Sequence, residues 1–128
     1  MAVQMNMPIL IVDDYRTMLR IVRNLLSKLG FTDIDEAADG EMALAMLKSR
    51  DYGLVISDWN MQPMTGFELL KVVRADEVLK TMPFIMVTAE SKIENVQAAR
   101  QAGVNNYIIK PFSGAVLKAK LKAVLGEF

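Results

Sequence analysis

Five polar side chains follow runs of apolar residues and together could carry out phosphoryl chemistry. Asp13 and Asp14 close the run "MPILIV", and Asp58 closes "LVIS". Thr88 and Lys110 follow two later runs, "PFIMV" and "NNYII". If they are brought together, each pair of carboxylates repels by roughly 4 kcal/mol at about 4 Å and an intermediate effective dielectric. Such a group therefore calls for a cation in addition to the lysine.

The chemistry expected of these groups is metal-assisted attack of a carboxylate on phosphorus. Oxygen ligands at an open edge favour Mg²⁺, which keeps several waters and accepts phosphate oxygens. A carboxylate beside Mg²⁺ and Lys110 can become an aspartyl phosphate, while Thr88 donates its hydroxyl to a phosphate oxygen. The chain has no His and no Cys, which excludes histidine general bases, thiol nucleophiles and thiolate metal sites.

Ten segments of alternating character must position these side chains. Continuous apolar runs are typical of strands inside a parallel sheet, and spacings of three and four indicate helices. Strands are predicted at 7–14, 32–38, 52–58, 83–89 and 105–110, and helices at 15–29, 40–50, 65–76, 91–103 and 113–125. The alternation indicates a parallel sheet covered by helices on both faces. The carboxyl ends of such strands meet at one edge, so the five polar groups are expected there.

Capping signals and apolar spacing define the helices further. Gly30 is placed to end the first helix, and Thr65 with Glu68 has capping-box spacing. The same spacing recurs at Ser91 and Glu94. The buried helix faces are expected to include Met18, Val22, Leu25, Leu29, Met42, Ala43, Met46, Leu47, Val116, Leu117, Leu121 and Val124.

The bulk composition excludes several classes of protein. A length of 128 residues suits one domain, 1–128. Lys plus Arg equals Asp plus Glu at 15 each, so nucleic-acid binding is not expected. No apolar run is long enough to span a membrane, and the start lacks the basic region and cleavage site of a secretory signal. We therefore expect a cytoplasmic protein without membrane partners.

These motifs resemble those of the response-regulator receiver family over the whole chain. The resemblance rests on Asp13-Asp14, Asp58, Thr88 and "KPF" at 110–112; "DWNM", "VTAE" and "QAG" are most similar to its single-domain chemotaxis regulators. It implies an α/β, flavodoxin-like receiver fold. In that fold a doubly wound, five-stranded parallel sheet of order 2-1-3-4-5 carries five helices.

The resemblance also implies a role for each site residue. Asp58 would be the phosphoacceptor, and Lys110 would pair with the phosphoryl group. Mg²⁺ would be held by Asp14, Asp58 and the backbone carbonyl of Asn60, with Asp13 helping through water. The peptide bond after Lys110, to proline, is cis in the family.

A switch and a partner surface are implied as well. Thr88 would move toward the phosphate and Tyr107 would turn inward, while Asn60 and Glu90 tune hydrolysis of the phosphate. The switch and partner surface would comprise Trp59, Glu90, Ser91, Ile93, Val96, Arg100, Tyr107, Ile109, Phe112 and Lys120.

The function implied is a phosphorylation-activated switch of a two-component system. A chemotaxis-type histidine kinase would phosphorylate a monomeric chain, which would bind the flagellar motor switch and be reset with the help of a phosphatase. The chain would catalyse only its own phosphorylation and dephosphorylation, so no separate enzyme activity is expected. An alternative is a stand-alone phosphate sink or a non-chemotaxis adaptor. A haloacid-dehalogenase-type phosphatase is disfavoured because Asn60 replaces its general acid, and a flavodoxin-like carrier because Asp13-Asp14 would repel a bound phosphate.

One local departure from the family pattern lies just after the acceptor. The receiver pattern usually reads Met-Pro-x-Met, whereas this chain has Met61-Gln62-Pro63-Met64. Proline fixes its own φ and restricts the residue before it, so Gln62 is expected to be extended. We expect a locally altered loop, an unchanged acceptor, and the Asn60 carbonyl as the metal contact most affected.

Overall fold

Five parallel strands form one sheet in the order β2-β1-β3-β4-β5 in the computed structural model, which describes residues 3–128. The strands are β1 (Ile9–Val12), β2 (Ile34–Ala37), β3 (Leu54–Ser57), β4 (Phe84–Thr88) and β5 (Asn106–Ile109). The predicted fold class and strand order are confirmed, and each strand is slightly shorter than its predicted range. The first two residues of the predicted domain, 1–128, lie outside the described residues.

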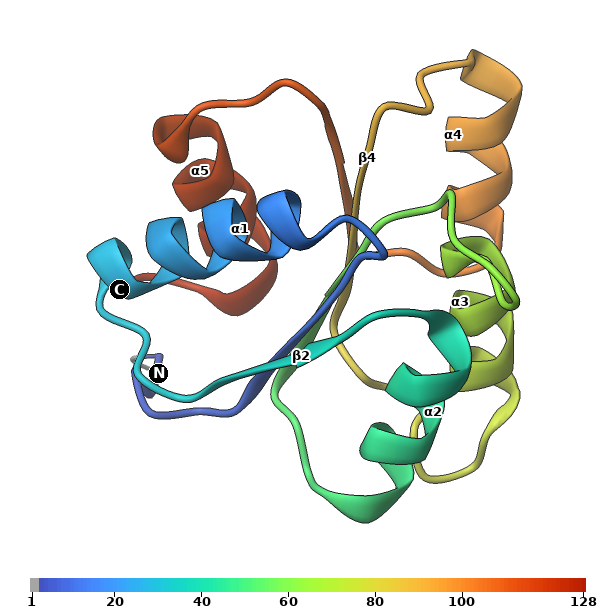
Figure 1. Cartoon of the computed structure of the whole chain (residues 1–128), viewed down its shortest axis with the longest axis horizontal. Coiled ribbons are helices and arrows are strands. Elements are labelled where there is room, and N and C mark those ends of the chain that lie inside the picture. Colours follow the sequence, from blue (N-terminus) through green and yellow to red (C-terminus); the bar gives the residue numbers. More distant parts are fainter. Residues whose placement is uncertain (1–2) are drawn as a thin grey trace.

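Helices cover both faces of this sheet (Figure 1). They are α1 (Arg16–Leu29), α2 (Gly40–Ser49), α3 (Gly66–Ala75), α4 (Ile93–Gln101) and α5 (Gly114–Leu125). Helices α1 and α5 lie on one face, and α2, α3 and α4 lie on the other (Figure 1). No helix within residues 3–128 is long and apolar enough to cross a membrane.

The core is divided into two layers because alternate strand residues point to opposite faces. Ile9 and Ile11 of β1 pack with α1 and α5, whereas Leu10 and Val12 pack with α2, α3 and α4. All four side chains are buried. Burying an aliphatic side chain of this size contributes about 1.5–3 kcal/mol, so both layers hold the strand ends rigidly in place.

The helix starts agree with the capping signals in one case and differ in another. At α3, the Thr65 hydroxyl accepts the Glu68 N–H and the Glu68 carboxylate accepts the Thr65 N–H, both at 3.1 Å. The predicted box at Ser91 and Glu94 is wrong. Helix α4 has Lys92 as its N-cap, without a side-chain cap. Ser91 precedes that position by one residue, so its hydroxyl does not reach the free N–H groups of the first turn.

Two residues predicted on buried helix faces are exposed. Met42 is 47% exposed and Val116 is 41% exposed. Helix α2 contacts the sheet through Ala43 and Leu47, which are four residues apart, and Met42 lies one helical step outside that stripe. In α5, Leu117 and Leu121 form the corresponding stripe.

Candidate functional site

The predicted chemical residues gather at the edge formed by the carboxyl ends of the strands. Asp13 directly follows β1, Asp58 follows β3, Thr88 is the last residue of β4, and Lys110 follows β5. Parallel pairing of neighbouring strands aligns these ends along the sheet. Tertiary structure therefore brings together groups that are up to 97 residues apart in the chain.

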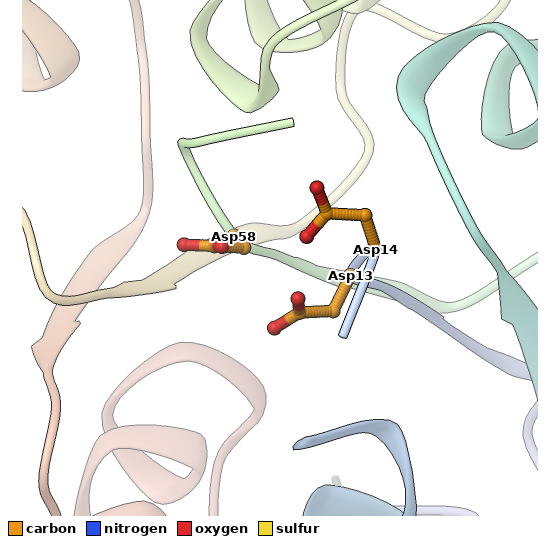
Figure 2. Close-up of side chains that lie close together, drawn as sticks. All are labelled: Asp13, Asp14 and Asp58. Carbon is orange, nitrogen blue, oxygen red and sulfur yellow. The ribbon is translucent and has the colours of Figure 1, made fainter. Parts of the chain in front are cut away.

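Three carboxylates form a compact cluster at this edge. Asp13, Asp14 and Asp58 each offer an oxygen, and these atoms all lie within 4.8 Å of one another. Figure 2 shows Asp13 and Asp14, from the end of β1, beside Asp58 at the end of β3. Asp13 and Asp58 are buried and Asp14 is exposed, so the cluster opens to solvent on one side. Hard oxygen donors with one open side fit Mg²⁺, which retains waters when bound to proteins.

Lys110 supplies a positive charge within this cluster. Its Nζ donates to Asp13 Oδ2 at 3.0 Å and lies 3.7 Å from Asp58 Oδ2. The Lys110–Pro111 peptide is cis, as the resemblance implied. The ammonium of Lys110 pairs with two of the three clustered carboxylates, so net negative charge remains for a cation to neutralise.

The electrostatic imbalance is visible at Asp13. Burial raises the pKa of the Asp13 carboxyl above its ordinary value, although hydrogen bonds from the Tyr15 N–H and Lys110 oppose that rise. The Tyr15 N–H donates to Asp13 Oδ1 at 2.9 Å. The charge on Asp58 raises the same pKa further. The metal-free fold therefore disfavours the ionised form of Asp13 relative to an Asp with an ordinary pKa.

We expect Asp13→Asn to stabilise the metal-free protein and weaken Mg²⁺ binding. The variant removes one repelling carboxylate, which is worth on the order of 1–3 kcal/mol at neutral pH. In the wild type, the protonated Asp13 carboxyl makes its full contribution to the free energy of unfolding below about pH 4. That contribution is lost as the pH rises through the pKa of Asp13 in the folded state, which is raised. The advantage of the variant should therefore shrink as pH falls. Thermal unfolding in EDTA and in Mg²⁺, across pH, measures both effects.

Asp51→Asn provides the matched control for this substitution. Asp51 is an exposed carboxylate that precedes β3, at the opposite edge of the sheet. Its replacement should leave both the metal-free melting temperature and the stabilisation by Mg²⁺ unchanged. If Asp13→Asn lowers the melting temperature in EDTA, the Asp13 carboxylate does not destabilise the metal-free protein and the prediction is wrong.

Glu90 connects the two predicted switch residues. Thr88 is completely buried, and its Oγ1 accepts the Glu90 N–H at 3.2 Å. The Tyr107 hydroxyl donates to the Glu90 carbonyl oxygen at 2.7 Å. Tyr107 is buried, and burial, with the charges of Glu90 and Asp58, raises its pKa to about 12. A movement of Thr88 or of the Glu90 backbone would therefore displace the carbonyl oxygen to which the Tyr107 hydroxyl donates.

The loop after the acceptor contains the shifted Pro63, and its structural difference from other members of the family stays a prediction. The Gln62–Pro63 peptide is cis, which the sequence reasoning did not anticipate. Asp58 nevertheless occupies the strand end, and Asn60 lies exposed two residues further on. Participation of the Asn60 carbonyl in metal binding stays a prediction.

The predicted partner surface lies on α4, β5 and α5. A groove of about 500 Å³ brings together five of its residues: Val96, Arg100, Tyr107, Ile109 and Lys120. Ile93 is 71% exposed and Ile109 is 44% exposed, so apolar side chains are available beside the groove. Ser91 is also exposed, and Phe112 is half-buried. Trp59 lies apart from them, beside Asp58.

Sequence reasoning missed two residues on the first turn of α3. Gly66 donates its N–H to the Trp59 carbonyl at 2.9 Å, and the Phe67 ring stacks on the Trp59 ring. The only signal in the sequence was their closeness to Asp58. A contact across the intervening loop cannot be read from spacing alone.

Comparison with known proteins identifies the relatives of the chain. The family model described as "Response regulator receiver domain" matches residues 9–122. The chemotaxis protein CheY-3 of Vibrio cholerae serotype O1 is 57% identical over 119 residues, covering 93% of this chain and 92% of the relative. Among solved structures, Vibrio cholerae CheY4 is 35% identical with a TM-score of 0.86, covering 94% of this chain and 99% of that chain.

A further solved structure is described with a metal ion. It is the receiver domain of the sensor histidine kinase PA1611 from Pseudomonas aeruginosa PAO1, with a magnesium ion coordinated in the active site cleft. It is 27% identical with a TM-score of 0.85, and the match covers 95% of this chain and 99% of that chain.

Proposed function

Because the chain belongs to the response regulator receiver domain family, we propose that it is a phosphorylation-activated switch that controls flagellar motor switching in chemotaxis. The observation that carries the chemical part is the arrangement of Asp58, buried at a strand end between Lys110 and the two acidic residues after β1. The similarity to CheY-3, a chemotaxis protein by name, supports the biological part.

The chemical step is transfer of a phosphoryl group to Asp58. A carboxylate oxygen of Asp58 attacks phosphorus, and the bond from phosphorus to the donor breaks, with its electron pair going to the leaving group. A phosphorylated histidine of a kinase supplies a P–N bond, and a small acyl phosphate supplies a P–O bond. Lys110 lies 3.7 Å from Asp58 Oδ2, where its ammonium would stabilise charge on the phosphoryl oxygens.

Mg²⁺ would be held by Asp13, Asp14 and Asp58, with the Asn60 carbonyl as the further ligand that we propose. When bound, it would neutralise the carboxylates and the developing phosphate charge. The ion described in the PA1611 receiver domain supports this choice of metal.

Phosphorylation would change the conformation of the partner surface through Thr88. Thr88 donating its hydroxyl to the phosphoryl group would shift the Glu90 backbone, to which Tyr107 is bonded. The groove on α4, β5 and α5 would then change shape beside Ile109 and Lys120. A flagellar motor switch protein would bind that groove.

The proposal includes the surrounding pathway. A chemotaxis-type histidine kinase donates the phosphoryl group, the chain acts as a cytoplasmic monomer, and a phosphatase assists its reset. The chain catalyses only its own phosphorylation and dephosphorylation. If the phosphorylated chain shows no tighter binding to a purified motor switch protein than the unphosphorylated chain, a phosphate sink or another adaptor replaces the motor role.

The test of the chemical step uses the single Trp, Trp59, and the mass of the intact chain. After Mg²⁺ saturation, acetyl phosphate should change Trp59 fluorescence and add one phosphoryl group to the wild type. Asp58→Asn should do neither, whereas Asp51→Asn should behave as the wild type. Phosphorylation of Asp58→Asn at the wild-type rate would show that the acceptor is another residue. Sustained hydrolysis of a phosphate ester at enzymatic rates would instead favour a phosphatase.

A further inference from the structure

An aromatic stack stands directly beside the acceptor. The rings of Trp59 and Phe67 are nearly parallel, with an interplanar angle of 2° and centroids 4.8 Å apart. Lys71 Nζ lies 5.2 Å from the centroid of the Phe67 ring. Both aromatic residues are half-buried. Parallel stacking with an adjacent cation favours one orientation of the Trp59 ring over the alternatives.

The backbone of Trp59 holds the acceptor side chain. Its N–H donates to Asp58 Oδ1 at 2.8 Å, while Asp58 Oδ2 faces Lys110. The Trp59 carbonyl accepts the Gly66 N–H at 2.9 Å. The first turn of α3 therefore holds Trp59 at two points, through the Gly66 N–H at the carbonyl and through Phe67 at the ring.

We infer that Phe67 is a positioning residue for phosphorylation of Asp58. The stack restricts the conformations of Trp59, so its N–H stays aimed at Asp58 Oδ1 and the carboxylate keeps one orientation. A fixed carboxylate spends more time in the geometry needed to attack phosphorus. This inference rests on the proposed function, and it assigns to Phe67 a role that acts through Trp59.

The competing explanation is that the Gly66 hydrogen bond alone holds Trp59. In that case Phe67 only shields apolar surface, and an aliphatic side chain of similar size would serve equally well. The two explanations differ in what the aromatic face contributes. Leucine keeps apolar bulk at position 67 without a planar ring, whereas tyrosine keeps the ring.

The experiment compares Phe67→Leu and Phe67→Tyr with the wild type at saturating Mg²⁺. The rate of phosphorylation by acetyl phosphate is measured from the mass of the intact chain, so that it is independent of Trp59 fluorescence. We expect Phe67→Leu to be phosphorylated roughly three- to tenfold more slowly, and Phe67→Tyr to remain within about twofold of the wild type. The dissociation constant for Mg²⁺ is measured for each variant, because Asp58 is also one of the proposed ligands, and the rates are compared at saturation of each variant.

Two controls make the result specific to the stack. Val72→Ala truncates a partly exposed apolar residue on the same helix and should leave the rate unchanged. Fluorescence anisotropy of unphosphorylated Phe67→Leu should fall, since the Trp59 ring gains motion. Phe67→Met provides a second unstacked variant should the leucine variant fold poorly by circular dichroism.

The outcomes separate this inference from the proposed function. Wild-type phosphorylation that depends on Asp58, with Phe67→Leu and Phe67→Met equal to the wild type, would overturn the role of Phe67 alone. An equal loss in Phe67→Tyr would also overturn it, because the ring would then be irrelevant. Absence of Asp58-dependent phosphorylation in the wild type would overturn the proposed function together with this inference.

Discussion

Replacement of Gly66 by alanine is expected to destabilise the protein by about 2–4 kcal/mol and to slow its phosphorylation severely. A Cβ at Gly66 would lie 1.9 Å from the Asp58 carbonyl oxygen and 2.8 Å from its carbonyl carbon. Both are backbone atoms, so a rotamer change cannot relieve the clash. Helix α3 or the end of β3 would have to move, and the bond from the Gly66 N–H to the Trp59 carbonyl would be lost.

Gly114→Ala is the matched control for that substitution. Gly114 is the first residue of α5, as Gly66 is of α3. A Cβ there would meet only the Leu25 Cδ2 atom at 3.3 Å, the end of a flexible side chain. Alanine is preferred over glycine in a helix by roughly 0.5–1 kcal/mol, so this variant should be as stable as the wild type or more so. Urea unfolding and intact-mass phosphorylation assays measure the pair. Equal unfolding midpoints for Gly66→Ala and the wild type would refute the steric account.

Replacement of Arg74 by methionine is expected to lower the free energy of unfolding by about 3 kcal/mol. The half-buried guanidinium of Arg74 donates to the carbonyl oxygens of Gly103 at 2.9 Å and Met82 at 2.7 Å. It also donates to Asn105 Oδ1 at 2.9 Å, and that oxygen accepts the Phe84 N–H. Burial lowers the pKa of Arg74, and these neutral acceptors compensate for its lost hydration.

The expected damage lies in the loops that Arg74 joins, before β4 and before β5. Methionine would keep much of the apolar stem and leave those carbonyl groups without their donor. Hydrogen exchange should accelerate around Val104, and urea should unfold the variant at a lower concentration. Arg74→Lys should recover only part of the loss, because one ammonium cannot reproduce the guanidinium fork. Arg20→Met, at an exposed position of α1, is the control and should unfold like the wild type. A loss of similar size in the control would contradict a specific role of Arg74.

Much of the architecture was predictable because it depends on local patterns. Continuous apolar runs located four of the strands, and spacings of three and four located the five helices. The segment that forms β2 is more polar and gave a weaker strand signal. Thr65 and Glu68 formed the expected capping box, whereas Ser91 did not cap α4 because the helix begins one residue later than its spacing required. Helix ends are sensitive to the path of the preceding loop, which local propensity does not determine.

By itself, the sequence determined which residues stand at the strand ends and therefore which groups share one edge of the sheet. That follows from strand periodicity and from the common direction of parallel strands, and it applied to Asp13, Asp58 and Lys110 alike. The strand order came from the family resemblance. Only the tertiary structure decided that Lys110 bonds to Asp13 more closely than to Asp58.

The same holds for the first turn of α3, where Phe67 faces Trp59. Such contacts depend on how loops return and how side chains from separate segments fit together. The energy of such a contact depends on the distance between atoms of segments that are separated in the chain. Neither the composition nor the periodicity of the sequence gives those distances.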